Sequence, residues 1–346
     1  DFTNNGGPFS FLYITDKTIT FDGGSQQTID SSSEITLLNM EINNTRSDAL
    51  SAPDVQVADG SLVSVSDKLI MTSGRLQTSA DLTLEPGSRI IYNSTDGSDA
   101  NNLLDSYITD DVDVERSLRG SSDWISLSPS DTTTYDEFLD ESKAGVNDLW
   151  TQGPANSDVP TADSTEANLF YYDESASKND QSNGWTVVSD MNNQIDLTRG
   201  HFLYPFSDDD PFDGTDEGFT KIIDAVGSPN FKPSTSIPVT ATDFDGNGIA
   251  GDTEDGWNLI ANPYLNTIDW DGDNQGGDGV DTTDIGGTIY VYDAENDDYI
   301  SFNGTNQNSG KAFSDSGYVA PLQAIFVKAS GPSPSITVDI VNDQVP

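Results

Sequence analysis

The segment DFDGNGIAGDTE has the residue types and spacing of a calcium-binding loop. It matches the pattern D-x-[DN]-x-[DN]-G-x5-E, in which oxygen ligands wrap around Ca²⁺ over about twelve residues. The expected ligands are the side chains of Asp243, Asp245, Asn247 and Glu254 and the carbonyl oxygen of Ile249. The glycine at the sixth position permits the sharp turn, and Glu254 would close the site with two oxygens. The pattern therefore predicts one Ca²⁺ site.

A second acidic cluster comes after the first and starts in the same way. Asp269, Asp271 and Asp273 reproduce the D-x-D-x-D beginning, but Val280 stands where the closing glutamate belongs. One interpretation is a looser calcium site. The other is that Asp269 caps the turn after Ile268.

The segments around the first loop indicate which elements must position it. SIPVTAT (236–242) precedes the loop and GWNLIANPY (256–264) comes after it, and both are rich in β-branched or aromatic residues. Such segments are typical of strands, and each contains a proline. We therefore expect a calcium loop between strands and not a helix–loop–helix sensor.

The sequence contains little that indicates a catalytic site. A serine protease triad or a zinc site would have to use His201, which is the single histidine, and neither G-x-S-x-G nor H-E-x-x-H accompanies it. His201 lies beside Phe202 in a strand-like segment, so we expect a structural role. Pairs of carboxylates are unavoidable among 59 acidic residues and point to no reaction. We expect a protein that is not an enzyme; a hydrolase using carboxylates that cannot be singled out is a third interpretation.

Three tryptophans raise the question of sugar binding. Trp124, Trp257 and Trp270 could stack on sugar rings, because exposed indoles present large flat apolar faces. Trp124 and Trp257 recur at equivalent places in two similar halves of the chain. That recurrence favours packing in the core.

The composition is strongly acidic. The formal charge is −45, yet 34% hydrophobic and 9% aromatic residues favour folded domains over disorder. Such a surface repels nucleic acid and anionic membranes, and no apolar run is long enough to span a bilayer. Bound Ca²⁺ and a high-salt environment would both offset the self-repulsion, and we expect both to operate in a halophilic source. Without cysteine, disulfides and thiol chemistry are excluded.

The organisation along the chain predicts an all-β protein. Residues 1–105 alternate apolar and polar positions between Asp-Gly, Ser-Gly and Pro-Gly turns, which is typical of a β-solenoid or a stacked β-repeat module. Residues 106–217 and 218–346 are expected to form two β-sandwich-like units, A and B, that together could make one domain. A short helix is expected within 132–145, where two acidic residues suit a first turn.

Units A and B look duplicated. Four pairs of segments align: RGSSDWISLSP with EDGWNLIANPY, ANLFYYDE with GTIYVYDA, GWTVVS with DYISFN, and IDLTRGHFLYPF with VAPLQAIFVKAS. We therefore expect Trp124 to superpose on Trp257 and Tyr171 to lie near Tyr290, all of them buried. The alternative is chance similarity between β-rich segments.

A family resemblance rests on these same segments. GWNLIANPYLNTIDW (256–270) resembles the "GWNL-x-x-NPY-x-x-x-IDW" segment of large secreted and cell-surface proteins of Bacteroidota, many exported by the type IX secretion system. Residues 287–304 and 321–330 resemble the segments downstream of that motif, and residues 1–91 resemble the β module upstream of it. The resemblance implies a secreted architecture, and it says very little about activity. Because the chain opens inside a repeat, we expect a trimmed form of a longer precursor.

We therefore expect an extracellular, non-catalytic structural or adhesive surface protein stabilised by Ca²⁺, with filament formation as one possible mode. Its partners would be copies of itself, other surface proteins or glycans. The alternative is a carbohydrate-binding or accessory module of a larger secreted enzyme. Aromatic residues lining a groove would favour the binding module, and open strand edges would favour assembly.

Overall fold

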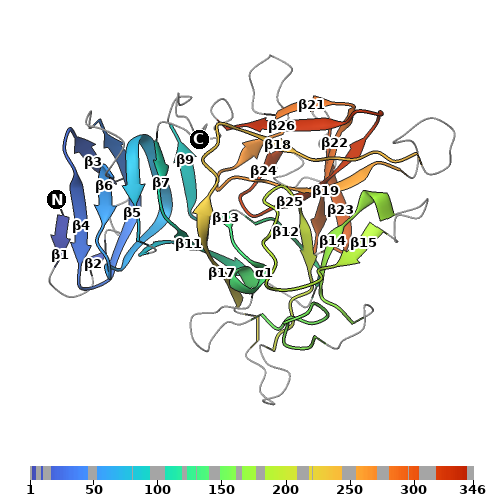
Figure 1. Ribbon diagram of the computed structural model, residues 1–346, viewed down its shortest axis with the longest axis horizontal. Helices are drawn as coiled ribbons and strands as arrows, with labels where there is room; N and C mark the ends of the chain where they lie inside the picture. The colour runs from blue at the N-terminus through green and yellow to red at the C-terminus, as the bar shows by residue number, and fades with distance from the viewer. Residues whose placement is uncertain are drawn as a thin grey trace.

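The structure, a computed structural model, describes residues 2–4, 9–10, 17–45, 53–79, 81–93, 106–118, 123–129, 131–139, 149–160, 166–176, 184–208, 218–219, 221–243, 255–270, 280–294, 296–303 and 317–340. Strands dominate this described part, so the all-β expectation is confirmed. A stack of parallel strands, blue to cyan in Figure 1, lies at one end of the molecule, and a broader group of sheets lies at the other. Within the described residues, no helix has the length and apolar character needed to cross a membrane.

Three parallel ladders build the N-terminal part. The strands are β1 (Phe2–Asn4), β2 (Phe9–Ser10), β3 (Thr18–Gly23), β4 (Gln27–Ser31), β5 (Ile35–Asn44), β6 (Val55–Val57), β7 (Val63–Gln77), β8 (Leu82–Leu84), β9 (Arg89–Tyr92), β10 (Ser106–Ile108) and β11 (Val112–Leu118). One ladder joins β1, β4, β6, β7 and β10, a second joins β2, β5, β7, β8 and β11, and a third joins β3, β5, β7 and β9. The long strands β5 and β7 take part in more than one ladder.

Apolar side chains stack in register inside these ladders. Met40 pairs with Leu69, and Leu69 pairs with Ile90, on three successive strands. All three side chains are fully buried. Alternating residues of a strand point to opposite faces, so the apolar positions of successive strands line up and form a continuous interior. The alternation in the sequence is what places them there.

The parallel part is joined to the rest through one antiparallel ladder. Strand β11 pairs in parallel with β8 on one side and antiparallel with β17 (Lys221–Pro229) on the other. The expected boundary at residue 105 therefore falls before the last two parallel strands. Strand β17 also pairs with β13 (Asp131–Thr132), and the helix α1 (Tyr135–Leu139) packs against β17. Helix α1 lies inside the range where a helix was expected, and residues 140–148 lie outside the described part.

Two four-stranded antiparallel sheets form the centre of the C-terminal part. The first contains β12 (Ile125–Leu127), β16 (His201–Leu203), β14 (Leu169–Tyr172) and β15 (Trp185–Val187), in that order. The second contains β19 (Trp257–Ala261), β25 (Ala324–Ala329), β22 (Ile285–Asp293) and β23 (Asp298–Phe302), in that order. Each sheet places its strands in the same order relative to the chain. Smaller pairings complete this part: β18 (Ser234–Ile237), β26 (Ser335–Asp339) and β21 (Val280–Thr283) form one sheet, β20 (Ile268–Asp269) pairs with β24 (Tyr318–Val319), and η1 (Glu174–Ala176) comes directly after β14.

The registers of the two sheets correspond residue by residue. Phe202 lies opposite Phe170 in the first sheet, and Phe326 lies opposite Tyr290 in the second. Tyr290 is therefore matched by Phe170, as in the alignment of ANLFYYDE with GTIYVYDA, and Tyr171 lies one position further along the strand. Since side chains alternate along a strand, that single step moves Tyr171 to the opposite face.

The expected burial of these residues is wrong, because Tyr171 and Tyr290 are half-buried and so are the two tryptophans. Trp124 and Trp257 are half-buried and pack against the edge of an aromatic cluster. Trp124 lies edge-on to Tyr204, with ring centroids 5.4 Å apart. At the matching place in the second sheet, the Nζ of Lys328 lies 5.4 Å from the Trp257 ring centroid. Both indoles therefore have equivalent neighbours, at the rim of the interior and not inside it.

The GWNLIANPY segment acts as a hydrogen-bonding centre. The side-chain amide nitrogen of Asn262 lies 2.7 Å from the carbonyl oxygen of Asn266 and 3.1 Å from that of Val319. The Asn258 amide nitrogen donates to the Thr240 carbonyl at 2.8 Å. Both asparagines are nearly fully buried. Because irregular backbone leaves carbonyls without a ladder partner, buried side-chain amides are needed here to satisfy them.

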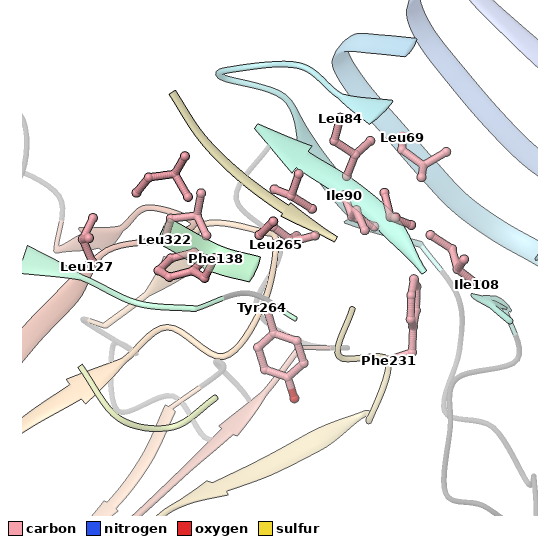
Figure 2. Close-up of a cluster of buried hydrophobic side chains, with 14 of the residues drawn as sticks. Leu69, Leu84, Ile90, Ile108, Leu127, Phe138, Phe231, Tyr264, Leu265 and Leu322 are labelled. Carbon is pink, nitrogen blue, oxygen red and sulfur yellow. The ribbon is translucent and has the colours of Figure 1, made fainter. Parts of the chain in front are cut away.

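Tyr264, the tyrosine of the same segment, joins the two parts of the molecule. Its ring centroid lies 5.9 Å from that of Tyr92 on β9, and Tyr92 in turn contacts Phe231. The backbone N–H of Ile90 donates to the Leu265 carbonyl at 2.7 Å. Figure 2 shows Ile90, Phe231 and Tyr264 in one apolar cluster that runs from the parallel strands into the C-terminal part. The core is therefore continuous across the junction.

Candidate functional site: an aromatic pocket between two sheets

A pocket of about 490 Å³ opens between the two four-stranded sheets. This volume suits a small ligand or one residue of a larger one. Its described lining consists almost entirely of rings, together with one carboxylate: Trp124, Phe170, Trp185, Phe202, Tyr292, Asp297 and Tyr299. The rings come from both sheets, so the pocket exists only where the two sheets meet.

The strand registers explain why these rings share one space. Phe202 is directly opposite Phe170, and Trp185 is directly opposite Tyr172. Residues opposite one another in an antiparallel pair lie on the same face, as do residues two apart along a strand. All four rings therefore project from one face of the first sheet. The same reasoning places Tyr292 and its partner Tyr299 on one face of the second sheet.

The two aromatic faces meet through contacts that match in pairs. Phe202 of the first sheet lies 5.3 Å from Tyr292 of the second, and Phe326 of the second lies 5.5 Å from Tyr172 of the first. Phe202 and Phe326 themselves are 6.2 Å apart at the centre. These are centroid separations at which aromatic pairs attract in tilted or edge-on geometry.

One acid lies at the mouth of the pocket. Asp297 is exposed in the turn between β22 and β23, with a φ of 48°. The hydroxyl of Tyr292 donates to its Oδ1 at 2.8 Å. Burial raises the pKa of Tyr292, and the hydrogen bond to Asp297 and the nearby charge of Asp123 raise it further. The phenol therefore stays protonated and keeps its hydrogen bond to Asp297 at the rim.

The residues of the first calcium loop lie mostly outside the described part. Asp243, the first residue of the loop, is described, whereas Asp245, Asn247, Ile249 and Glu254 lie outside the described residues. Within the described part, no group of three or more acidic or histidine side chains is arranged to hold a metal ion. The calcium site stays a prediction.

The second acidic cluster is described only at its start. Asp269 is half-buried in β20, where it pairs with Tyr318 of β24. Asp271 and Asp273 lie outside the described residues. The choice between a looser calcium site and a turn cap therefore stays open.

A buried glutamate holds the two ends of the first loop together. Glu174 of η1 is 3% exposed. Its Oε1 accepts hydrogen bonds from the backbone N–H of Thr242 at 2.8 Å and of Gly256 at 3.2 Å, and its Oε2 accepts one from the Thr242 hydroxyl at 2.7 Å. The residues before and after the loop are thereby fixed to the first sheet. Glu174 was not foreseen from the sequence, because its partners are 68 and 82 residues away.

The three tryptophans singled out in the sequence do not form one platform. Trp270 is 8% exposed and belongs to the main core, and Trp257 packs on Tyr290 outside the described pocket lining. Of these three tryptophans, only Trp124 belongs to the described pocket lining. Its companions Trp185 and Tyr299 were missed, although the alignment of GWTVVS with DYISFN placed them at equivalent positions.

No protein family, curated protein or solved structure matches the chain. The geometry of the pocket is therefore the main guide to function. The resemblance to secreted Bacteroidota proteins rests on its sequence motifs.

His201 lies in the interior of the first sheet. It is 2% exposed, and its Nε2 is 2.8 Å from the hydroxyl of Tyr135 on α1. Burial, together with the charge of Arg199, lowers the pKa of His201 to about 3. The imidazole is thus neutral at neutral pH and holds α1 against the sheet.

This environment makes the stability depend on pH. Below about pH 6.5 His201 is protonated in the unfolded chain but remains neutral in the folded protein. The contribution of His201 is therefore present above that pH and lost progressively as the pH falls toward the folded pKa of about 3. Between pH 7 and pH 5.5 the loss should be roughly 1 kcal/mol.

We expect the His201→Gln variant to lose less stability over this interval than the wild type, by that amount. Urea unfolding at the two pH values measures the difference. The contributions of the carboxylates are the same in both proteins and cancel in the comparison. Tyr135→Phe is the matched control, since it removes the hydrogen bond but keeps the histidine and its pH dependence. Equal pH dependence in wild type and His201→Gln would contradict the prediction.

Proposed function

We propose that this chain is an extracellular, non-catalytic surface protein that captures a ligand in the aromatic pocket between its two central sheets. The pocket is the observation that carries the proposal, because rings from two separate sheets converge on one open space. The sequence resemblance to secreted and cell-surface proteins of Bacteroidota supports the location. The buried position of the single histidine supports a non-catalytic role, because His201 is not available as a catalytic base.

The N-terminal part, in this proposal, is a three-faced parallel β-solenoid that serves as a spacer. Support comes from the three parallel ladders and from polar side chains that bond between successive layers. The Thr20 hydroxyl donates to Glu41, 21 residues away, and the Thr83 hydroxyl donates to Asp113, 30 residues away. Stacked contacts of this range are typical of one supersecondary unit repeated along an axis.

The two central sheets, in the same proposal, are duplicated units packed face to face. Their identical strand order and the matched contacts of Phe202 and Phe326 support this arrangement. The result is a binding module whose pocket arises from the meeting of two copies of one motif. Aromatic residues that line an open pocket favour a binding or accessory module over a purely structural protein.

The first test measures ligand capture directly. Glycan arrays and isolated surface polymers should contain a ligand that changes the tryptophan fluorescence of the protein. Tyr299→Ala should weaken that binding by about tenfold or more, because an aromatic contact contributes about 1.5 kcal/mol. Tyr299 is 44% exposed, so the substitution should leave the fold intact. Tyr318→Ala is the matched control, since Tyr318 is 41% exposed and lies outside the described pocket lining. Equal losses in both variants, or none, would argue against the pocket.

Calcium is the proposed stabilising ion. The clamp by Glu174 supports this proposal, because it brings the chain before and after the predicted loop to one place. Chelation should lower the melting temperature of the wild type, and Asp245→Ala should remove most of that response. An ion at 100 times its Kd stabilises the folded state by about 2.7 kcal/mol. Asp22→Ala, at an exposed position of β3, should respond to chelation like the wild type. A wild type indifferent to chelation would rule the site out.

Assembly is the second candidate function. Among the described strands, β1, β2 and β3 each pair on one side only, so the first layer of the parallel stack leaves backbone groups without a ladder partner. Such an edge can pair with another chain. The charge of −45 opposes this unless salt or Ca²⁺ screens it. Sedimentation velocity should then show larger species at molar salt or in calcium than in dilute buffer. A monomer under all conditions would leave only the binding module.

A further inference from the structure

We propose that the pocket recognises a quaternary ammonium group, such as the trimethylammonium of a choline headgroup. This inference rests on the proposed function, because it names the ligand class of the same pocket. The observations behind it are the number and contacts of the rings, the carboxylate at the rim and the scarcity of polar partners among the described lining residues.

The rings form a cage of the right kind. Six aromatic side chains line the pocket. Neighbouring pairs have centroids 4.9 Å apart for Trp185 and Phe202, 5.3 Å for Phe202 and Tyr292, and 5.4 Å for Tyr292 and Tyr299. Rings this closely spaced let one cation lie within about 6 Å of several centroids at once, the range of the cation–π attraction.

The electrostatic field favours a positive ligand. The Asp297 carboxylate lies at the mouth, and the charge of Asp123, which precedes Trp124, acts on Tyr292 inside. The protein as a whole carries −45. Such a field raises the local concentration of cations and repels anions, so acidic sugars and phosphates alone are disfavoured.

The low polarity of the described lining favours a quaternary ammonium over a primary ammonium or a sugar. A primary ammonium brings three N–H donors that each need an acceptor, and a sugar brings a hydroxyl at nearly every carbon. Among the described lining residues, Asp297 is the one carboxylate, and it already accepts from Tyr292. A quaternary ammonium has no N–H group and buries its methyl groups against rings at no hydrogen-bonding cost.

The chain uses the same attraction within its own fold. At the place in the second sheet that matches Trp124, the Lys328 ammonium lies 5.4 Å from the centroid of Trp257. Arg199 lies over Tyr171 at 4.7 Å. In the first sheet the position that matches Lys328 holds Tyr204, so a ring and not a cation lies beside Trp124 at that place.

The experiment centres on two ligands that differ in charge alone, choline and dimethylbutanol. Choline and tetramethylammonium are titrated into the full chain by calorimetry and tryptophan fluorescence, beside dimethylbutanol, in which carbon replaces the choline nitrogen. A methyl glucoside represents neutral sugars. We expect the cations to bind at least tenfold more tightly than dimethylbutanol. Adding salt should weaken the binding of the cations and leave that of the alcohol unchanged.

Variants test the two parts of the cage separately. Tyr299→Leu keeps an apolar side chain but removes a ring, and it should weaken choline binding about tenfold while changing dimethylbutanol binding little. Asp297→Asn should weaken choline binding severalfold. Tyr318→Leu and Asp281→Asn, both at exposed positions outside the described lining, should bind choline like the wild type.

The possible outcomes separate this inference from the proposed function. Equal binding of choline and dimethylbutanol, or preferential binding of the glucoside, would overturn the quaternary ammonium and leave a binding pocket. No binding of any probe, with no glycan ligand either, would overturn both. Co-sedimentation with phosphatidylcholine vesicles would indicate that the protein binds the headgroup on a surface, and binding of free choline alone would indicate a free small molecule. Either result supports the inference.

Discussion

The meeting of two aromatic sheet faces is the interaction on which the C-terminal part of this protein depends. Each face alone would expose four or more rings to water, at a cost that grows with the apolar area left uncovered. Packed together, Phe202 and Phe326 lie at the centre and each contacts a tyrosine of the opposite sheet. The faces do not close completely, and the pocket is the space that their rims leave open. The pocket is in this sense a by-product of how the two sheets stabilise each other.

Much of this arrangement could be predicted from the sequence. Alternating apolar positions with regular turns indicated the strand content, and the alignment of four segment pairs placed Trp185 and Tyr299 at equivalent positions. Periodicity also explains the stacked interior around Leu69, because the pattern of a strand fixes which side chains face inward. These features are local, or repeat locally, and a single sequence carries them.

The parts that could not be predicted depend on contacts between distant segments. Nothing near Glu174 in the sequence indicates that it accepts hydrogen bonds from Thr242 and Gly256, because its role exists only once two sheets are side by side. The pocket is missed for the same reason. The burial of Trp124 was misjudged. Recurrence in two halves indicates that two residues have equivalent surroundings, but it does not indicate whether those surroundings lie in the core or at its rim. The buried amide of Asn262 likewise looked like part of a motif and is a structural hydrogen-bonding centre.

The pairing of β11 with β17 determines how mechanical load would pass through the molecule. The chain leaves the parallel stack at the end of β11, builds the whole first sheet, and returns along β17 in antiparallel register over the 7 residues of β11. A force between the far end of the stack and the central sheets reaches the first sheet along the backbone that follows β11, and this ladder transmits part of it to β17. Where such a force runs along the strands, all of the ladder's hydrogen bonds are loaded together and not one after another. The junction between the parallel stack and the central sheets would then resist such a force as a unit.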